Sequence, residues 1–461
     1  MFKSEVYTKR REELQKKLKT GMAMFIGNTE APMNYSSNTY HFRQDSDFLY
    51  FFGLDIPGFI ALMDFDSGND VIFGNDFDMD DIVWMGPQPT VKELAFKCGI
   101  TETHPVSRLE EIIKDALSKK RKIHFLPPYR GETKMMLGSL LKENPCQMIT
   151  HASVDLIKAV IEMRSIKEKV EIDEIEKAVG IAYDMHVTAM KMCKEGVMEQ
   201  DIFGTMEGIA LALGAGTSFP IILSINGQTL HNHAHGNRLK KGRMMVADAG
   251  AETNLHYASD ITRTTPVGGK FSQMQKDIYE IVLNANTEAI NMTRPGISNL
   301  DLHLRACKTI TLGLKQLGLM KGDADEAVAA GAHALFMPHG IGHMLGLDVH
   351  DMEGLGENLV GYSDEVVRSE QFGLAFLRFA LPYKPGHVFT VEPGCYFIPE
   401  LIEKWKTEGK FREFINYDKI DAYRPIGGIR IEDNVLITDK GHKVLGKPIP
   451  KTVKEIEAVC S

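Results

Sequence analysis

Short apolar runs alternate with helical stretches along the first part of the chain. The runs GMAMFIG from Gly21 and GFIALMDF from Gly58 have the length and composition of buried strands. Helical stretches with polar and apolar positions lie between such runs. This alternation is typical of a compact α/β domain, which we place at residues 1–160.

A long helical pattern indicates the start of a second domain, expected at residues 161–461. Ser165 and Glu168 have the spacing of a capping box, which opens many helices. Apolar residues then recur at helical spacing in the run from Lys167 to Glu195, and Gly196 ends it. The domain boundary is therefore expected just before this cap.

Two segments of the second domain match in residue type at an offset of one hundred residues. They are GVMEQDI from Gly196 and GISNLDL from Gly296, and each is expected to join two helices. Ser272 and Gln275 form another capping box, at the start of a helix that Pro295 and Gly296 end. The match indicates two related halves, although seven residues can also agree by chance. A cleft between two halves is a common place for a ligand site.

Composition narrows the class of protein. The 461 residues are 43% hydrophobic and 25% charged, as in soluble globular proteins, and no apolar run has the roughly 18 residues of a membrane span. The charged N-terminus lacks the apolar stretch of a signal peptide, and the six cysteines contain no CxxC pair, so we expect a cytoplasmic protein with reduced thiols. A net charge of −9 without a long basic block argues against nucleic acid as a partner.

The segment PHGIGHMLGLDVHD, from Pro338, contains His339, His343 and His350. The first two have the i, i+4 spacing of a zinc-binding helix. However, the glutamate that a thermolysin-type pair needs as general base is missing, and glycines at 340, 342 and 346 disfavour a helix. A tight turn or strand is expected instead.

A second histidine-rich segment, LHNHAHG, contains His231, His233 and His235. On a strand these three side chains would lie on one face, where three imidazoles could bind zinc. An exposed polar strand end is the more frequent explanation for such a pattern.

Four carboxylates lie beside apolar, strand-like runs, where an unpaired buried charge is costly. They are Asp248 and Asp260 in VADAGAETNLHYASDITRT, Glu392 in FTVEPG and Glu432 in GGIRIED. Any one of them is more often an ordinary salt-bridged or capping residue, but four together favour a cation site. Two divalent ions would neutralise them, and one imidazole would complete a shell that suits Mn²⁺ or Co²⁺, with Zn²⁺ as an alternative. Two metals can hold a hydroxide and polarise a carbonyl, so metal-assisted hydrolysis is the natural reaction class.

The ordered segments ADAGAE, SDITRT, HGIGH, TVEPG and GIRIED resemble the pita-bread (M24) metallopeptidases, which include aminopeptidase P, prolidase and methionine aminopeptidase. The resemblance implies an α+β protein whose C-terminal catalytic domain has the creatinase/aminopeptidase-like pita-bread fold. Its dinuclear site would have as ligands Asp248, Asp260, His343, Glu392 and Glu432, with Asp260 and Glu432 bridging. Twelve positions separate the two aspartates instead of the family's usual eleven, which predicts a longer turn.

The same resemblance implies roles for residues around the metals. His231, His339 and His350 would line the substrate site, hold the scissile carbonyl and stabilise the developing tetrahedral charge. Arg430 would orient nearby acidic groups, and Glu392 would share in proton transfer from the bridging water.

The stretch FRQDSDFLYFFGLDIPG, residues 42–58, is similar to the N-terminal domain that aminopeptidase P and prolidase share and methionine aminopeptidase lacks. It implies an N-terminal creatinase-type α/β domain, proline-directed exopeptidase activity and a homo-oligomer, either a dimer or a tetramer. In such enzymes a tryptophan from a neighbouring subunit can close the site. Trp84 in DDIVWMGP resembles that residue, and a partly buried core tryptophan is the alternative.

Two segments favour prolidase within this branch. GLAFLRFALPYKPG places Arg378 where prolidases keep an arginine for the carboxylate of a dipeptide, and residues 396–433 contain a prolidase-like insertion between the two glutamates. The loop at residues 353–372 fits neither branch closely. We therefore expect proline-containing di- or oligopeptide substrates and place Xaa-Pro dipeptidase ahead of Xaa-Pro aminopeptidase. A metal-free binding protein of the same fold is a remote third possibility, because all five ligand positions are filled.

Overall fold

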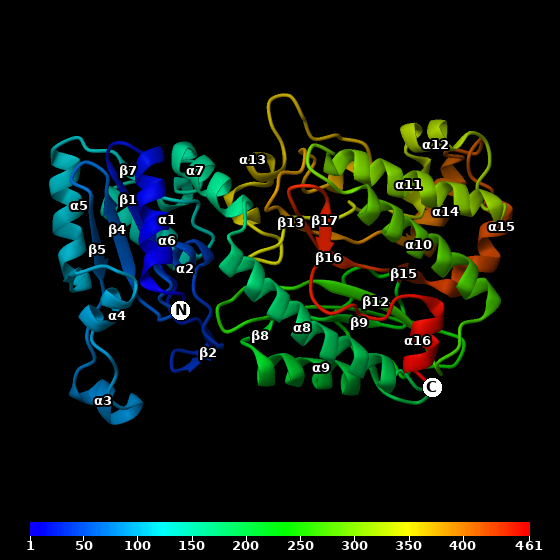
Figure 1. The fold of residues 1–461 in the computed structure, drawn as a ribbon, viewed down its shortest axis with the longest axis horizontal. Coiled ribbons are helices and arrows are strands. Elements are labelled where there is room, and N and C mark those ends of the chain that lie inside the picture. The colour runs from blue at the N-terminus through cyan, green and yellow to red at the C-terminus, as the bar shows by residue number, and fades with distance from the viewer. The chain divides into compact units, whose positions relative to one another are not determined.

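The computed structural model describes residues 1–461 and divides them into two compact units, Met1–Arg164 and Ser165–Ser461 (Figure 1). The boundary lies at residue 164 instead of 160, because helix α7 (Val154–Ser165) belongs almost entirely to the first unit. Near the end of α7, Arg164 forms a 2.6 Å ion pair with Asp47 of the same unit.

The first unit is built around a five-stranded sheet with the strand order β6-β5-β4-β1-β7. The two apolar runs of the sequence form its neighbours β1 and β4, which pair in antiparallel register from Met22↔Asp64 to Ile26↔Ile60. The strands of the sheet are β1 (Met22–Ile26), β4 (Ile60–Asp64), β5 (Asn69–Phe73), β6 (Glu102–His104) and β7 (Ile123–His124). The other elements are α1 (Ser4–Lys17), the hairpin of β2 (Pro32–Tyr35) and β3 (Asn38–Thr39), α2 (Ser46–Phe52), α3 (Met79–Met85), α4 (Val91–Lys97), α5 (Leu109–Ser118) and α6 (Gly131–Leu141).

Two pairs of long helices in the second unit repeat at an offset of one hundred residues. The first pair is α8 (Lys169–Met192) and α9 (Glu199–Leu213), and the second is α10 (Gln273–Met292) and α11 (Asn299–Gln316). The turns between them contain Gly196 at φ +88° and Gly296 at φ +87°, a conformation that glycine adopts without strain. The predicted repeat, in which each copy joins two helices, is therefore confirmed.

The predicted helix caps were right in one half and wrong in the other. Ser272 caps α10 and forms the expected capping box with Gln275. In the other half the box consists of Glu168 and Glu171, since Ser165 still belongs to the end of α7. The sequence has capping-box spacing at Ser165 and Glu168 and again at Glu168 and Glu171. Because α7 extends to Ser165, the second pair caps α8.

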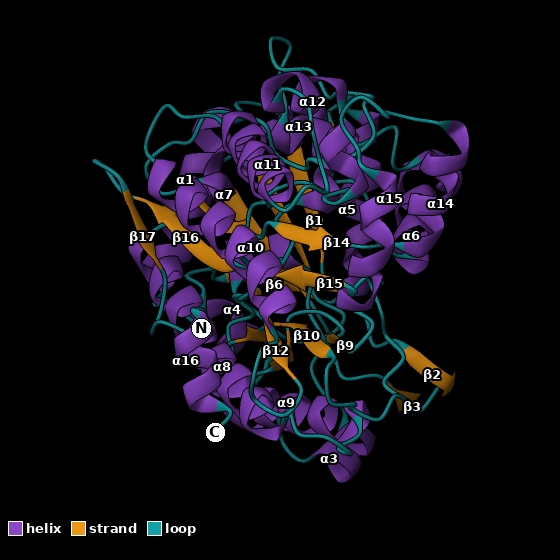
Figure 2. Cartoon of the chain, turned by 90° about the vertical axis from the view of Figure 1, so that its right-hand side faces the viewer, coloured by secondary structure: helices purple, strands orange, loops and turns teal.

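The helix pairs enclose short strands that form small antiparallel sheets (Figures 1 and 2). One half contains β8 (Gly216–Thr217), β9 (Ile222–Ser224), β10 (Met244–Ala249), β11 (Ala251–Glu252) and β12 (Ile261–Pro266). The other half contains β13 (Val388–Val391), β14 (Gly394–Tyr396), β15 (Gly428–Arg430), β16 (Asp433–Ile437) and β17 (His442–Val444). The remaining helices are α12 (Ala324–Ala330), α13 (Glu357–Gly361), α14 (Pro399–Glu408), α15 (Tyr417–Ile420) and α16 (Val453–Val459).

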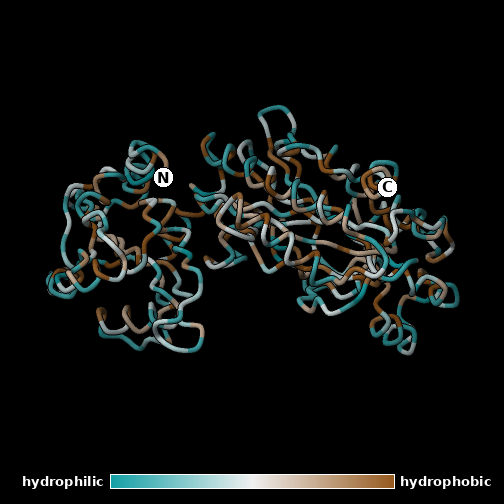
Figure 3. Tube along the Cα trace, turned by 90° about the horizontal axis from the view of Figure 1, so that it is seen from below, coloured by the Kyte–Doolittle hydropathy of each residue, from teal (hydrophilic) through white to brown (hydrophobic).

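The main core of the second unit packs α10 and α11 against these strands. Ile278, Val282, Leu302 and Ile310 are fully buried in it. Hydrophobic stretches run through the helices and strands of each unit, and hydrophilic stretches are found mainly in the outer loops (Figure 3). None of the helices combines the length and the apolar character needed to span a membrane.

Candidate metal centre

The hairpin of β10 and β12 carries two carboxylates. Its ladder runs without a break to Ala249↔Ile261, so Asp248 lies at the end of β10 and Asp260 directly before β12. A Cβ atom on Gly250 would come within 1.7 Å of the Ser259 carbonyl oxygen, so the two sides of the connection can approach only at a glycine. The longer turn that the spacing predicts includes β11 and leaves the register of the flanking strands intact.

A second pair of strands carries the two glutamates. Glu392 follows β13 and Glu432 precedes β16, and the pairing of Val391 with Asp433 brings both to the same end of the sheet. The HGIGH segment is not helical, as its glycines predicted. It lies against β13, where the amide of Thr390 donates a 2.9 Å hydrogen bond to the carbonyl of His343.

The five predicted ligands come together from these elements. His343 Nε2 lies 3.2 Å from Asp260 Oδ2 and 3.8 Å from Glu392 Oε1. Potential ligand atoms of Asp260, His343 and Glu432 all lie within 4.8 Å of one another. The Asp248 carboxylate is close enough to Asp260 to raise the pKa of that residue. We call these five residues the carboxylate cluster.

Burial makes this cluster electrostatically unfavourable without a cation. Desolvation and the neighbouring carboxylates raise the pKa of Asp260 and of Glu432 well above the usual range. Burial also raises the pKa of Glu392, against the opposing influence of His343. Burial is likewise the main reason why the pKa of His343 is lowered, so this imidazole is neutral near pH 7.

The hydrogen bonds of the cluster leave positions that a divalent cation would fill. His343 Nδ1 lies 3.0 Å from the Met344 carbonyl and so carries the proton, which leaves the lone pair of Nε2 facing Asp260. The buried oxygens Asp248 Oδ1, Asp260 Oδ1 and Glu432 Oε1 have no hydrogen-bond partner. Several unpartnered carboxylate oxygens and one neutral imidazole form the donor set that divalent metals bind, so these residues fit a metal centre.

Arg430 and Thr262 hold the outer side of the cluster. Arg430 is 4% exposed and donates from Nη2 to Asp248 Oδ2 and from Nε to the Thr262 hydroxyl at 3.2 Å. The same hydroxyl donates a 2.8 Å hydrogen bond to Glu432 Oε2. Thr262 was missed in the sequence, although it lies within SDITRT and belongs to a strand whose polar residues are all buried.

Tyr396 is a second residue that sequence reasoning missed. Its hydroxyl lies 2.9 Å from Arg430 Nη1 and 2.9 Å from His339 Nε2, which connects these two predicted site residues. The strand pairing of Tyr396 with Gly428 brings it next to the cluster, and no local pattern in the sequence signals that position.

The predicted catalytic histidines lie around the cluster. The rings of His343 and His350 are in edge contact with centroids 4.3 Å apart, and His339 Nδ1 lies 3.9 Å from Glu392 Oε2. His231 lies in an exposed turn, where partial desolvation and the positive charge of Arg430 lower its pKa.

The three histidines of LHNHAHG do not share a strand face. The segment forms a turn and loop, His233 is exposed, and His235 is buried. The ring of His235 stacks on Phe203 and bonds to the Leu223 carbonyl at 3.0 Å. The alternative of a three-histidine zinc site is therefore wrong, because the turn separates the side chains.

Arg378 lies at the edge of the site and has two acidic partners. Its Nη1 is 2.9 Å from Glu353 Oε2 and also pairs with Glu357. Glu353 in turn bonds to His350 Nδ1 at 2.7 Å, and this hydrogen bond is the main reason why the pKa of Glu353 falls to about 2. Arg378 is thus linked through Glu353 to a histidine beside the cluster.

Trp84 lies in the first unit, on α3, and is 85% exposed. The alternative of a partly buried core tryptophan is wrong. Its neighbours Met79, Val83 and Met85 are between 63% and 71% exposed, so this short helix presents an apolar surface.

Comparison with known proteins assigns families to both units. Residues 173–439 match the model of metallopeptidase family M24, and residues 7–124 match the aminopeptidase P N-terminal domain. The Xaa-Pro dipeptidase of Homo sapiens is 31% identical over 453 residues, which cover 96% of this chain and 89% of that protein. A probable Xaa-Pro aminopeptidase of Aspergillus clavatus is 32% identical over 431 residues, covering 91% and 88% of the two chains.

Solved structures agree with this assignment. Proline aminopeptidase P II from Yersinia pestis has a TM-score of 0.83 and 27% identity, over 100% of this chain and 99% of that one. Zn-substituted Escherichia coli aminopeptidase P in complex with product has a TM-score of 0.82 and 29% identity, over 100% and 98%. With a matched catalytic model and relatives above 30% identity along nearly its whole length, the chain is a hydrolase of metallopeptidase family M24, with a pita-bread domain preceded by an aminopeptidase P N-terminal domain.

Proposed function

We propose that the chain is a proline-specific metallo-exopeptidase that hydrolyses the bond between an N-terminal residue and the proline that follows. The observation that carries this proposal is the set of buried, unpartnered oxygens of the carboxylate cluster, together with the His343 Nε2 that faces Asp260, in a family of peptidases. Relatives named Xaa-Pro dipeptidase and Xaa-Pro aminopeptidase support the choice of bond.

Asp248, Asp260, His343, Glu392 and Glu432 of the carboxylate cluster would hold two divalent ions, and Asp260 and Glu432 would be shared ligands. Mn²⁺ is proposed first, with Co²⁺ and Zn²⁺ as alternatives, because an oxygen-rich shell with one imidazole suits these ions. When bound, the ions would supply an activated water as nucleophile and polarise the scissile carbonyl.

The protein groups around the cluster have separate proposed tasks. Glu392 would take a proton from the attacking water, and its 20% side-chain exposure, compared with 8% for Asp260, supports access to substrate. His231, His339 and His350 would line the substrate site, where His231 and His350 would bind the carbonyl oxygen as it becomes negative. His339 would shape the site with a ring whose two nitrogens are held by Gly340 and Tyr396. Arg430 would orient the Asp248 carboxylate through the hydrogen bond between them.

Xaa-Pro dipeptidase is the first candidate because of Arg378. Its positive charge reaches the cluster, where burial first and then Arg378 lower the pKa of His343 against the opposing effects of Glu392 and the Met344 carbonyl. A guanidinium at this edge would bind the free carboxylate of a dipeptide. The pairing of Arg378 with Glu353 and Glu357 is the specific observation that favours the second candidate, Xaa-Pro aminopeptidase, because a substrate carboxylate would have to compete with both.

The test compares hydrolysis of a Xaa-Pro dipeptide and a Xaa-Pro-Xaa tripeptide by Mn²⁺-loaded protein, with a chelated sample as control. The dipeptidase proposal expects preference for the dipeptide and a loss of about tenfold or more in its kcat/KM in Arg378→Met, since a charge-assisted hydrogen bond contributes about 1.5–3 kcal/mol. Arg368→Met is the matched control, because Arg368 also pairs with Glu357.

Each outcome decides between the candidates. Preference for the tripeptide, with an equal response of both arginine variants, would make the protein an aminopeptidase. Absence of metal-dependent cleavage of either substrate would overturn the assignment to proline peptidases.

We further propose a homo-oligomer, a dimer or a tetramer, in which Trp84 of one subunit closes the site of another. The exposed apolar surface of α3 supports an interaction at that place. A cytoplasmic location is also proposed, supported by six cysteines without a disulfide bond.

A further inference from the structure

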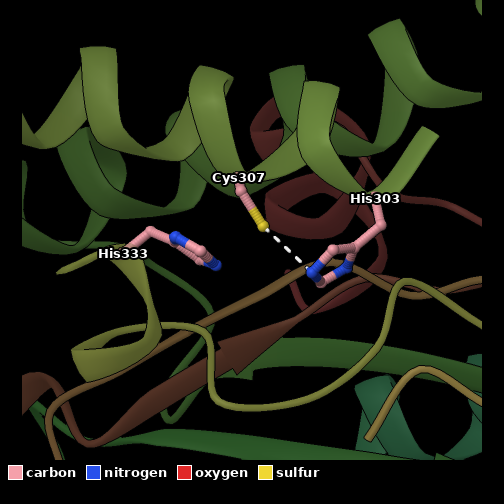
Figure 4. Close-up of side chains that lie close together, drawn as sticks. All are labelled: His303, Cys307 and His333. Carbon is pink, nitrogen blue, oxygen red and sulfur yellow. Dashed lines mark hydrogen bonds between the residues drawn. The ribbon is translucent and has the colours of Figure 1, made fainter. Parts of the chain in front are cut away.

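A second group of metal-ligating side chains lies in the core of the second unit, apart from the carboxylate cluster. His303 and Cys307 are one turn apart on α11 and lie on the same face of that helix. His333, in the short 3₁₀ turn Ala332–Leu335, faces them (Figure 4). Potential ligand atoms of the three residues all lie within 4.8 Å of one another. We call them the His–Cys–His cluster.

The cluster is buried, and its hydrogen-bonding capacity is mostly unused. His303 and Cys307 are 0% exposed and His333 is 1% exposed. The single contact among the polar atoms joins Cys307 Sγ to His303 Nε2 at 3.5 Å. His303 Nδ1 and both ring nitrogens of His333 have no hydrogen-bond partner. Burying polar groups in this way is costly, and an ion bound by Cys307 Sγ and a ring nitrogen of each histidine would offset part of that cost.

The chemistry of the three groups favours a soft metal ion. Both imidazoles are buried, which favours their neutral form and leaves a lone pair on each ring. A thiol and two imidazoles in contact are ligands that zinc accepts, whereas the oxygen ligands preferred by Mg²⁺ or Ca²⁺ are missing among them.

We propose that His303, Cys307 and His333 form a structural site for one Zn²⁺ ion that is separate from the carboxylate cluster. On binding, the Cys307 S–H bond breaks, its proton passes to solvent, and an S–Zn bond forms while each imidazole donates a lone pair. A water molecule would complete four-coordination.

The place of the site in the chain gives it a structural role. His333 precedes His339 by six residues and His343 by ten, so an ion would fasten to α11 the segment that leads to the carboxylate cluster. Because all three ligands are buried, the ion would enter during folding and exchange slowly in the folded protein. The inference does not depend on the proposed peptidase activity.

Cobalt provides a readout that only this site can give. The protein is unfolded, stripped of metal and refolded with increasing Co²⁺, and its near-ultraviolet absorption is followed. A thiolate ligand gives an intense sulfur-to-cobalt charge-transfer band, whereas the oxygen and nitrogen ligands of the carboxylate cluster give none. The expected result is a band whose final intensity corresponds to one thiolate-bound Co²⁺ per chain and which does not develop when Zn²⁺ is present during refolding.

Three cysteine variants locate the band. Cys307→Ser is expected to abolish it, whereas Cys193→Ser, at a buried cysteine directly after α8, and Cys146→Ser, at an exposed one, are expected to retain it. If Cys307→Ser fails to refold, His333→Gln serves instead and should weaken Co²⁺ binding at least tenfold.

Thermal unfolding gives a second, independent measurement. In a variant whose carboxylate cluster is disabled by Asp260→Asn and Glu432→Gln, Zn²⁺ is expected to raise Tm, and the added Cys307→Ser change is expected to remove that rise. Refolded wild-type protein that shows no sulfur band and binds no more metal than its Cys307→Ser variant would overturn the proposal. The His–Cys–His cluster would then be bridged by water or held by packing alone.

Discussion

The hydroxyl of Tyr396 lies 2.9 Å from Nε2 of His339. The opposite nitrogen, Nδ1, lies 2.7 Å from the Gly340 carbonyl and must therefore carry the proton of the neutral ring. Nε2 then accepts a hydrogen bond from Tyr396, whose oxygen accepts one from Arg430 Nη1 at 2.9 Å. Burial lowers the pKa of His339 to about 4, so the neutral ring and this direction of donation hold at physiological pH.

Replacing Tyr396 by phenylalanine tests this chain of hydrogen bonds. The variant removes the hydroxyl, frees His339 to rotate and leaves one buried donor of Arg430 unsatisfied. A net contribution of about 1 kcal/mol from the hydrogen bond to His339 predicts a fall of about fivefold in kcat with a smaller change in KM. Steady-state kinetics at saturating metal measure both constants. Unchanged kcat would show that the orientation of His339 does not depend on Tyr396.

Thr262 links Arg430 to Glu432, and Thr262→Val removes that link at nearly constant shape. Loss of a hydrogen bond to a metal-binding carboxylate usually weakens metal binding about 10–100-fold. We therefore expect the metal-activation curve to shift to higher concentration, with kcat restored at saturation. Thr265→Val, on the opposite face of the same strand and also buried, is the control and should leave the curve in place.

The sequence predicts features that depend on neighbouring residues better than features that depend on contacts between distant parts of the chain. The Ser272 cap, the glycine turns at Gly196 and Gly296 and the non-helical HGIGH segment follow from local rules, and the structure agrees with each. The ligand set came from the resemblance of ordered motifs, because no spacing along the chain shows that residues such as Asp248 and Glu432 converge.

Contacts between distant segments account for what the sequence missed. Tyr396 reaches Arg430 because β14 and β15 pair across the insertion that follows Glu392. Similarly, His333 meets Cys307 through the packing of the Ala332–Leu335 turn against α11. The prediction for the LHNHAHG segment was wrong for a local reason. Alternating histidines predict a strand, but the segment forms a turn and loop.

The carboxylate cluster predicts a pH dependence of stability in the metal-free protein. Asp260 and Glu432 have folded-state pKa values above the ordinary 3.8 and 4.5. As pH rises through that range the unfolded chain loses protons that the folded chain retains, so metal-free stability falls toward neutral pH. Divalent ions bind the ionised carboxylates, and their stabilising effect should therefore grow over the same range.

Thermal unfolding of chelated and Mn²⁺-loaded protein across a pH series measures this effect. Asp433 provides an internal contrast, since ion pairs with Arg263 and Lys451 outweigh its desolvation and hold its pKa at about 2. The stabilisation that ionised Asp433 gives the folded protein is fully present above pH 3.8 and is lost only as pH falls toward 2. That change lies below the pH range in which Asp260 and Glu432 act. A difference in Tm between the two samples that stays constant with pH would contradict the prediction.

Trp84 gives a prediction about the oligomer. Because its side chain is 85% exposed, Trp84→Ala should change the free energy of unfolding by no more than about 0.5 kcal/mol. Loss of activity would then reflect a lost contact with substrate or with a neighbouring subunit. Phe96→Ala, at another exposed aromatic residue of the first unit, is the control and should remain fully active.

Mixing two inactive variants separates an effect between subunits from one within a subunit. Glu392→Gln lacks the proposed proton acceptor but has an intact Trp84, while Trp84→Ala has an intact metal centre. If one subunit lends its tryptophan to another, co-refolded mixtures should recover activity that neither variant has alone, because some sites combine both intact parts. A mixture that is no more active than the sum of its components would place the action of Trp84 within its own chain, and full activity of Trp84→Ala by itself would remove this residue from the site.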